Sequence, residues 1–284
     1  MENVSRGTTK NLIDKCPLCD GAESDLVFTC EDYTVSHEKF PIHECRQCGF
    51  VYTKEIPEEK SIGEYYKSDT YISHSDQKKG IINQVYAKVR NYTLKQKVNW
   101  ARQFAQGNDI VDLGAGTGYF VNALQKSKFS VVGFEPDQDA RKVALGNFGL
   151  HLKPLDLFYE QEKIENLTMW HVLEHVYHLQ NFLNFIAEKM TKGGAWIFAV
   201  PNCESWDAQK YKSDWAAWDV PRHLYHFKKD QVKMIADQYG FSVEKIIPMH
   251  FDAYYVALLS EKYKKGNPLR AMMNAYKSEA FAQH

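Results

Sequence analysis

Two pairs of cysteines near the amino terminus have the residue type and the spacing of a metal site. Cys16 and Cys19 form one CxxC pair, and Cys45 and Cys48 form a second pair. The two sulfurs of a pair can reach one ion at about 2.3 Å, so two pairs complete a closed tetrahedral shell around zinc. A closed shell has no position for a substrate, so the spacing predicts a structural zinc ion. The alternatives are two disulfides, which a reducing compartment disfavours, and redox CxxC motifs, which lack a thioredoxin-like strand and helix pattern around them.

Glycines between two acidic residues form a second group with the spacing of a nucleotide-like binding site. Asp112 stands two residues before a GxGxG turn over 114–118, and Glu135 follows the next apolar segment. Dinucleotide sites use GxGxxG, whereas here the third glycine comes one residue early. A carboxylate at Asp112 would repel a pyrophosphate and would suit a positive group, such as the amino group of a methionine moiety. Glu135 is placed where a carboxylate can accept both hydroxyls of a ribose.

With these residues in place, the chain resembles the class I S-adenosylmethionine-dependent methyltransferases over about residues 85–260. The resemblance implies S-adenosylmethionine as cofactor and a fold of the α/β class. Asp112 would bind the methionine end, Glu135 the ribose, and Asp156 with Leu157 would border the adenine. The full set of cofactor-binding residues that we expect is Asp112, Gly114, Ala115, Gly116, Gly118, Glu135, Asp156, Leu157 and His171.

Histidines follow the strand predicted over residues 167–172, at the edge where such sheets bind ligands. His175 is our first candidate for a general base, because a histidine that titrates near neutrality can remove the proton of a methyl acceptor. A helix-start histidine bonded to backbone is an equally ordinary interpretation. Glu174 and His175 also match the metal-binding ExxEH segment of ubiquinone-biosynthesis O-methyltransferases, but His171 replaces the first acid of that segment, and we expect no catalytic metal there.

Aromatic and charged residues are concentrated between 206 and 227, where class I enzymes commonly carry a lid over the acceptor. Indole rings stack on sugar or ring faces, and an arginine can hold a phosphate or carboxylate with two hydrogen bonds. We expect His223 to be a second candidate base. The expected acceptor-binding residues are Tyr71, Trp215, Trp218, Arg222 and His226.

A cysteine module before such a domain is similar to the zinc-containing sugar methyltransferases. This likeness implies a small-molecule acceptor, such as a hydroxyl or carbon of a sugar, a nucleotide sugar or a polysaccharide precursor. An RNA base methyltransferase is the main alternative, but the first 60 residues carry a net charge of −5, which does not favour a phosphate backbone. A zinc-ribbon protein without catalysis is a further candidate, as is an NAD-linked oxidoreductase, which the short glycine spacing disfavours.

The elements that must position these residues follow from apolar periodicity. Short apolar runs predict strands over 109–113, 130–134, 167–172 and 195–200, with helices between them, and a final antiparallel pair over 241–247 and 252–259. We therefore predict a Rossmann-like, seven-stranded methyltransferase sheet with helices on both faces. The predicted parts are a zinc module (1–60), a linker with a helical segment (61–106), the methyltransferase domain (107–260, lid 203–227) and a basic helical tail (261–284).

Composition sets the remaining bounds. The chain has 284 residues, of which 44% are hydrophobic and 25% charged, with a net charge of −1, which excludes disordered and collagen-like chains. We find neither a secretory leader nor an apolar run long enough to cross a bilayer, and we expect a cytoplasmic protein. The partners we expect are a small-molecule substrate, without nucleic acid or membrane. The oligomeric state stays open.

Overall fold

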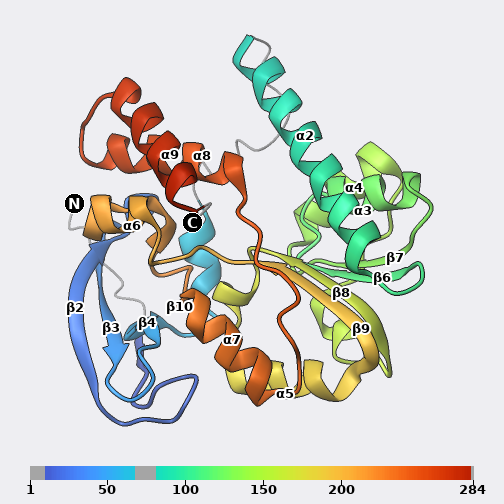
Figure 1. Ribbon diagram of the computed structural model, residues 1–284, viewed down its shortest axis with the longest axis horizontal. Coiled ribbons are helices and arrows are strands. Elements are labelled where there is room, and N and C mark those ends of the chain that lie inside the picture. Colours follow the sequence, from blue (N-terminus) through green and yellow to red (C-terminus); the bar gives the residue numbers. More distant parts are fainter. Residues whose placement is uncertain (1–9, 68–80, 283–284) are drawn as a thin grey trace, which may run out of the picture. The chain divides into compact units, whose positions relative to one another are not determined.

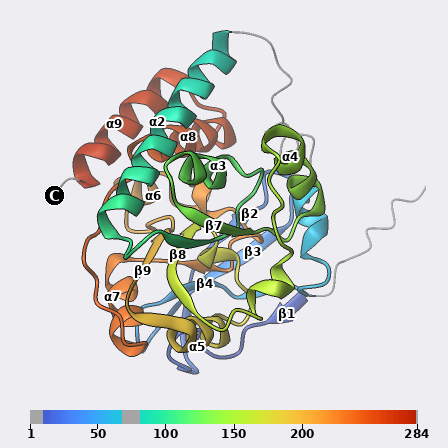
Figure 2. The ribbon, with the colours of Figure 1, turned by 90° about the vertical axis from the view of Figure 1, so that its right-hand side faces the viewer.

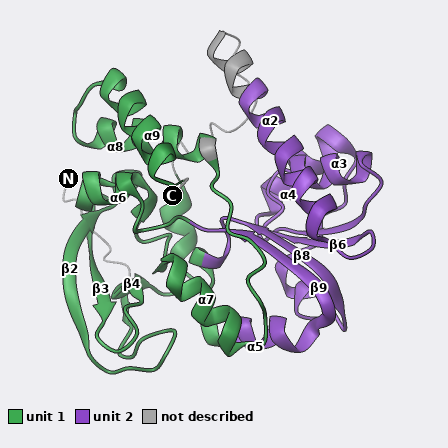
Figure 3. Cartoon of the chain, viewed as in Figure 1, with its two compact units in different colours: residues 1–77, 174–180, 201–284 green, residues 78–173, 181–200 purple. Residues whose placement is uncertain are grey.

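The computed structural model describes residues 10–67 and 81–282, which divide into two compact units (Figures 1 and 3). Unit 1 combines residues 1–77, 174–180 and 201–284, and unit 2 combines residues 78–173 and 181–200. These units cut across the predicted parts, because the predicted zinc module, lid and tail all fall in unit 1. No helix among the described residues has the length and apolar character needed to cross a membrane.

Unit 2 is built on a four-stranded parallel sheet in the order β7-β6-β8-β9. The strands are β6 (Asp109–Leu113), β7 (Ser130–Phe134), β8 (Ile164–Trp170) and β9 (Met190–Ala199). Central strands of a parallel sheet are covered on both faces, and four consecutive residues of β6, 110–113, are buried. The parallel register of β6 with β7 and β8 brings the carboxyl ends of all three strands to one edge.

Helices cover this sheet on both faces, which confirms the predicted α/β class. In Figures 1 and 2, α2 (Ile81–Phe104) and α3 (Tyr119–Lys126) lie on one side, and α5 (Leu179–Lys189) lies on the other. Val98 of α2 and Leu124 of α3 share an apolar cluster with Ile110 of β6. The fourth helix of this region is α4 (Gln138–Phe148), and a short 3-10 helix, η2, spans Leu155–Phe158.

The predicted number of strands and the final strand pair are wrong for the described residues. The parallel sheet has four strands there, residues 241–249 form no regular element, and residues 252–259 lie inside helix α8 (His250–Tyr263). Ala257, Ser260 and Glu261 of α8 are buried. Positions three and four residues apart share a helix face, so this burial has the period of a helix rather than the alternation of a strand.

Unit 1 contains an antiparallel sheet whose strands come from distant parts of the chain. Its order is β10-β4-β3-β2, with β2 (Ser24–Glu31), β3 (Lys39–Cys45), β4 (Val51–Thr53) and β10 (Tyr225–His226). Tyr225 pairs with Tyr52 and His226 with Val51. A separate ladder joins β1 (Lys10–Leu12) to β5 (Glu55–Pro57). The cysteine-bearing segment is therefore completed by a strand from residues 201–284.

The core of unit 1 mixes side chains from both ends of the chain. Phe40 and Ile42 of β3 lie in one buried cluster with Tyr211, Trp215 and Trp218. The remaining elements are the 3-10 helices η1 (Ile62–Tyr66), η3 (Leu173–His175), η4 (Lys212–Asp214) and η5 (Ala216–Trp218), and the helices α6 (Trp206–Tyr211), α7 (Lys229–Gln238) and α9 (Pro268–Ala282). A segment of about 50 residues buries too little surface to fold on apolar contacts alone, which explains why it recruits these partners.

Residues 1–60 expressed alone should therefore stay unfolded, even with zinc, because β10 and the two tryptophans would be missing. The measurement is an amide ¹H–¹⁵N correlation spectrum of the zinc-treated fragment, with the full chain as control. A well-dispersed spectrum of the fragment would contradict this prediction.

Candidate functional site

The four paired cysteines converge on one point of unit 1. The sulfurs of Cys16 and Cys48 are 3.6 Å apart, as are those of Cys19 and Cys45, and all four lie within 4.8 Å of one another. A zinc ion with bonds of about 2.3 Å in tetrahedral geometry would need sulfurs about 3.8 Å apart, whereas a disulfide needs about 2.05 Å. The donor set therefore fits a zinc ion and does not fit disulfides. Gly49 makes the second turn possible, because its φ of 70° lies in the left-handed region.

The glycine turn after β6 requires glycine at its ends for packing and leaves its middle open. A Cβ on Gly114 would collide with the side chain of Val172, and one on Gly118 would come 2.9 Å from the Cβ of Ala144. Both residues also have a positive φ, of 76° and 81°. A Cβ on Gly116 would meet nothing within 4 Å. The backbone at Gly116 thus faces open space that a ligand could approach.

Glu135 lies beside that open backbone at the end of β7. One carboxylate oxygen accepts a hydrogen bond from the amide of Gly116 at 2.7 Å, and the other accepts from Asp137 at 2.9 Å. Burial raises the pKa of Glu135, while these two backbone donors favour the ionised form. The structure therefore brings together the predicted glycines and the predicted ribose ligand.

Asp112 is buried at the end of β6. Its carboxyl is 1% exposed and accepts a hydrogen bond of 2.6 Å from the hydroxyl of Thr168 on the neighbouring strand. Burial raises the pKa of Asp112 to about 7. The side chain is enclosed between β6 and β8, and its contact with the methionine end stays a prediction.

The other predicted cofactor residues surround the same strand ends. Asp156, which is exposed, and the half-buried Leu157 lie on η2. The segment before η2 runs beside β7, since Lys153 exchanges backbone hydrogen bonds with Gly133 and Glu135. His171, with a left-handed φ of 58°, directly follows β8. Ala115 is buried at the turn, so all the predicted cofactor residues belong to unit 2.

The two candidate bases meet in unit 1. The imidazole rings of His175 and His223 have centroids 4.6 Å apart. Nδ1 of His175 is 2.9 Å from the carbonyl oxygen of Arg222 and 3.0 Å from the hydroxyl of Tyr66. A carbonyl can only accept, so Nδ1 carries the hydrogen and Nε2 keeps the lone pair that a general base needs. Sequence reasoning did not select Tyr66, because only the fold brings it to His175.

The electrostatics of this pair favour a neutral His175. Burial, and then the neighbouring imidazole of His223, lower the pKa of His175 from 6.5 to about 4. His223 donates from Nδ1 to the carbonyl oxygen of Ala217 at 2.9 Å, and its Nε2 lies 3.9 Å from a carboxylate oxygen of Asp219. The ligand atoms of Glu174, His175 and His223 also lie within 4.8 Å of one another, and such a donor set would suit a transition metal better than magnesium.

Four of the predicted acceptor-binding residues are buried in unit 1, and three of them, Trp215, Trp218 and Arg222, line a small hollow there. The indoles of Trp215 and Trp218 donate to a carboxylate oxygen of Asp207 at 2.7 Å and to the carbonyl of Lys212 at 2.6 Å. Nε2 of His226 lies 3.1 Å from the hydroxyl of Thr53. Arg222 is 1% exposed. Because their polar groups have partners inside the fold, these residues hold the unit together. Tyr71 lies outside the described residues.

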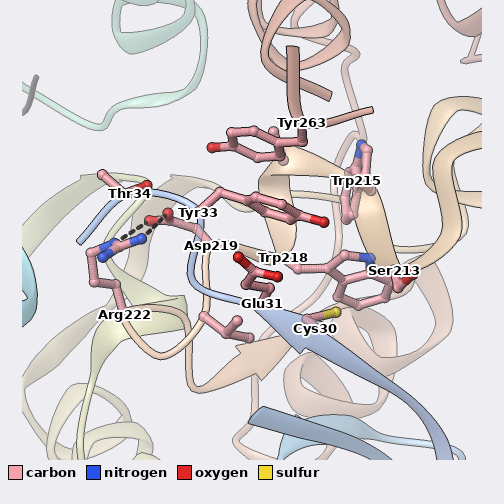
Figure 4. Close-up of a pocket in the computed structure, with 12 residues that line it drawn as sticks. Cys30, Glu31, Tyr33, Thr34, Ser213, Trp215, Trp218, Asp219, Arg222 and Tyr263 are labelled. Atoms are coloured by element: carbon pink, nitrogen blue, oxygen red, sulfur yellow. Dashed lines mark hydrogen bonds and ion pairs between the residues drawn. The ribbon is translucent and has the colours of Figure 1, made fainter. Parts of the chain in front are cut away.

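A small hollow lies beside this core. Figure 4 shows the rings of Tyr33 and Tyr263 above the carboxylate of Glu31, and the carboxylate of Asp219 beside Arg222. The two tyrosine rings stack with centroids 4.2 Å apart. Dashed lines in Figure 4 join Arg222 to Asp219, which therefore faces both this hollow and His223. The hollow and the histidine pair are thus linked through one carboxylate.

Comparison with known families matches residues 86–246, more than half of the chain, to a family described as "Methyltransferase domain". No curated protein matches the sequence. Many solved structures do, and three of them serve as examples.

Magnesium protoporphyrin IX methyltransferase from Synechocystis PCC 6803 with bound SAM is 16% identical, with a TM-score of 0.45, over 66% of this chain and 88% of that one. A SAM dependent methyltransferase from Archaeoglobus fulgidus is 17% identical, with a TM-score of 0.44, over 69% and 92%. The cyclopropane synthase MmaA2 from Mycobacterium tuberculosis is 14% identical, with a TM-score of 0.46, over 66% and 74%.

The purified protein should contain about one zinc ion per chain, and Cys45→Ser should lose that zinc together with the folded state of unit 1, because binding and folding are coupled. Metal content is measured by inductively coupled plasma mass spectrometry, and unfolding by circular dichroism. Cys203→Ser is the matched control, since Cys203 lies in the same unit outside the cluster. Unchanged zinc content in Cys45→Ser would contradict the site.

His175 should remain neutral at pH 6 and titrate near pH 4. The unfolded chain takes up this proton near pH 6.5, so the contribution of His175 to stability should decline as the pH falls from about 6.5 towards 4. The test is to follow the imidazole NMR signals from pH 7.5 to 4. The signal of His175 is assigned as the one that is missing in His175→Gln. A midpoint near 6.5 would show that the ring is not desolvated.

Proposed function

The chain belongs to the family of class I S-adenosylmethionine-dependent methyltransferases, and we propose that it methylates a small molecule whose acceptor atom must lose a proton. The observation that carries this proposal is the geometry of His175, whose Nδ1 is fixed by the carbonyl of Arg222. A ring held in this tautomer presents the lone pair of Nε2, which can accept the proton of an acceptor hydroxyl or acidic C–H.

The residues of unit 2 fit S-adenosylmethionine on their own geometry. Gly116 leaves open space where a Cβ would stand, and the carboxylate of Glu135 is already oriented by two backbone amides. We assign Glu135 to the ribose hydroxyls, the turn over 114–118 to the methionine portion, and Asp156 with Leu157 to the adenine. Asp112 would add negative potential behind the turn. When bound, the cofactor supplies an electrophilic methyl group on a sulfonium.

The proton of the acceptor would move to Nε2 of His175 as the new bond to the methyl carbon forms and the carbon–sulfur bond breaks. The carboxylates of Glu174 and Asp219 favour the resulting imidazolium. A base with a pKa near 4 removes a hydroxyl proton only as that proton becomes acidic, so proton transfer should accompany methyl transfer rather than precede it. Tyr66 would keep the ring in place through Nδ1.

For the acceptor we propose a sugar, a nucleotide sugar or a polysaccharide precursor. The cysteine module before the methyltransferase domain supports this class by its similarity to zinc-containing sugar methyltransferases. We also assign a structural zinc ion to Cys16, Cys19, Cys45 and Cys48, whose sulfurs have suitable separations.

The test is a transfer assay with methyl-labelled cofactor against nucleotide sugars, isoprenoid phenols and RNA. His175→Gln should lower kcat by about 10²–10⁴-fold, the usual contribution of a general base, with the affinity for S-adenosylhomocysteine unchanged by calorimetry. The matched control is His178→Gln, three residues along the same segment, because the His178 side chain is 73% exposed.

Label in RNA alone would overturn the proposed acceptor class. Loss of cofactor affinity in His175→Gln, with an unchanged rate per bound enzyme, would overturn the proposed base.

A further inference from the structure

We infer that Asp32, in the cysteine-bearing part of the chain, is a positioning residue that acts through Arg222 on His175 and His223. This inference deepens the proposed function and rests on it for the role of the two histidines. Asp32 touches neither imidazole. Every residue of the arrangement lies in unit 1.

The side chain of Asp32 is buried and is held by hydrogen bonds from its own loop. It directly follows β2 and is 1% exposed. One carboxylate oxygen accepts from the amide of Thr34 at 3.0 Å, and the other accepts from the amide and the hydroxyl of Ser36 at 2.8 and 2.9 Å. These bonds fix the carboxylate so that its first oxygen points at Arg222.

Arg222 joins Asp32 to two segments of the candidate site. Its Nη2 donates to Asp32 at 3.0 Å and to Asp219 at 2.7 Å, and its Nε donates to the second oxygen of Asp219 at 3.0 Å. Its Nη1 donates to the carbonyl oxygen of Tyr65 at 2.7 Å. One buried guanidinium therefore holds the segment before Tyr66, the turn at Asp219 and the end of β2 in a single arrangement.

The groups around Arg222 contact the imidazole of His175 or His223 directly or through the next residue in the chain. The carbonyl of Arg222 itself is the partner of Nδ1 in His175, and Tyr66, the other partner of that nitrogen, follows Tyr65 in the chain. Asp219, whose backbone has a left-handed φ of 36°, lies 3.9 Å from Nε2 of His223. A left-handed φ is uncommon for residues other than glycine, and aspartate is among those that adopt it most often. Displacement of Arg222 would release this turn and move both rings.

Charge explains why Asp32 matters to that arrangement. A buried guanidinium needs charged partners, and charge-assisted hydrogen bonds are about twice as strong as neutral ones. Asp32→Asn keeps the size of the side chain and removes its negative charge. The guanidinium would then be drawn towards Asp219 alone, and the carbonyl of Arg222 would lose its present orientation towards His175.

The first experiment uses the full-length protein and does not depend on an acceptor. In ¹⁵N-histidine spectra of the wild type, His175 should be in the Nδ1–H tautomer, and Asp32→Asn should shift its ring nitrogens towards a mixture of tautomers. His43 is an internal control, since it lies in the same unit on β3 and its Nδ1 contacts Ser24. Ser36→Ala is the matched control variant, because it removes a contact of Asp32 but leaves the charge that Arg222 needs.

Shifts confined to His175 and His223 in Asp32→Asn, with Ser36→Ala like the wild type, would support the inference. Unchanged His175 signals, or equal changes at His43, would overturn it, since the first excludes coupling and the second indicates a general structural role. This readout stays valid if no methyl transfer is found, so failure of the inference is distinguishable from failure of the proposed function.

The second experiment is a double-mutant cycle on kcat with the acceptor that takes up label. Asp32→Asn should lower kcat by about 10- to 100-fold, the order expected for a misplacement near 1 Å, with cofactor affinity unchanged. In a His175→Gln background the same substitution should change kcat less than about threefold, because the ring through which it acts is gone. Equal losses in both backgrounds would overturn the positioning role.

Discussion

A positive charge that is buried must be paired, and much of unit 1 is arranged around one such charge. Arg222 is 1% exposed, and its guanidinium makes four hydrogen bonds with Asp32, Asp219 and the carbonyl of Tyr65. Leaving an ion of this kind without partners would cost several kcal/mol. The segments that supply the partners are far apart in sequence, so satisfying this one charge requires the amino-terminal part of the chain to fold together with residues 201–284.

This requirement gives the cysteine-bearing segment a role beyond its own stability. Its strands accept β10 as a neighbour, its aromatic side chains share a core with Trp215 and Trp218, and its Asp32 reaches the turn that carries His223. A metal at the four cysteines would then stabilise unit 1, which contains the two candidate bases, His175 and His223. The module and the histidine pair form one structural unit, although sequence order places the parallel sheet between them.

In unit 2 the main constraint is that the backbone of the glycine turn over 114–118 must come close to a ligand. Gly114, Gly116 and Gly118 all have a positive φ. Gly114 and Gly118 are also required by their neighbours, whereas Gly116 keeps a space open. Glu135 then caps the exposed amide of Gly116. Asp112 is enclosed beside Thr168, and burial raises its pKa to about 7.

The sequence by itself determined the features that depend on local spacing. The cysteine pairs, the GxGxG turn, Glu135 and the apolar runs of the parallel strands are fixed by residues close together in the chain, and the structure brings each group together as spacing predicts. The apolar residues of helix α8 form a nearly continuous run, which predicts a strand, and only packing shows which of them share a buried face.

Tertiary structure alone decided that Arg222, Trp215 and Trp218 are internal, and that Tyr66 meets His175. The sequence does not show which group a polar side chain will contact. Whether that side chain binds a ligand or forms a hydrogen bond inside the fold depends on contacts between residues more than 100 positions apart, such as Tyr66 with His175 and Asp32 with Arg222.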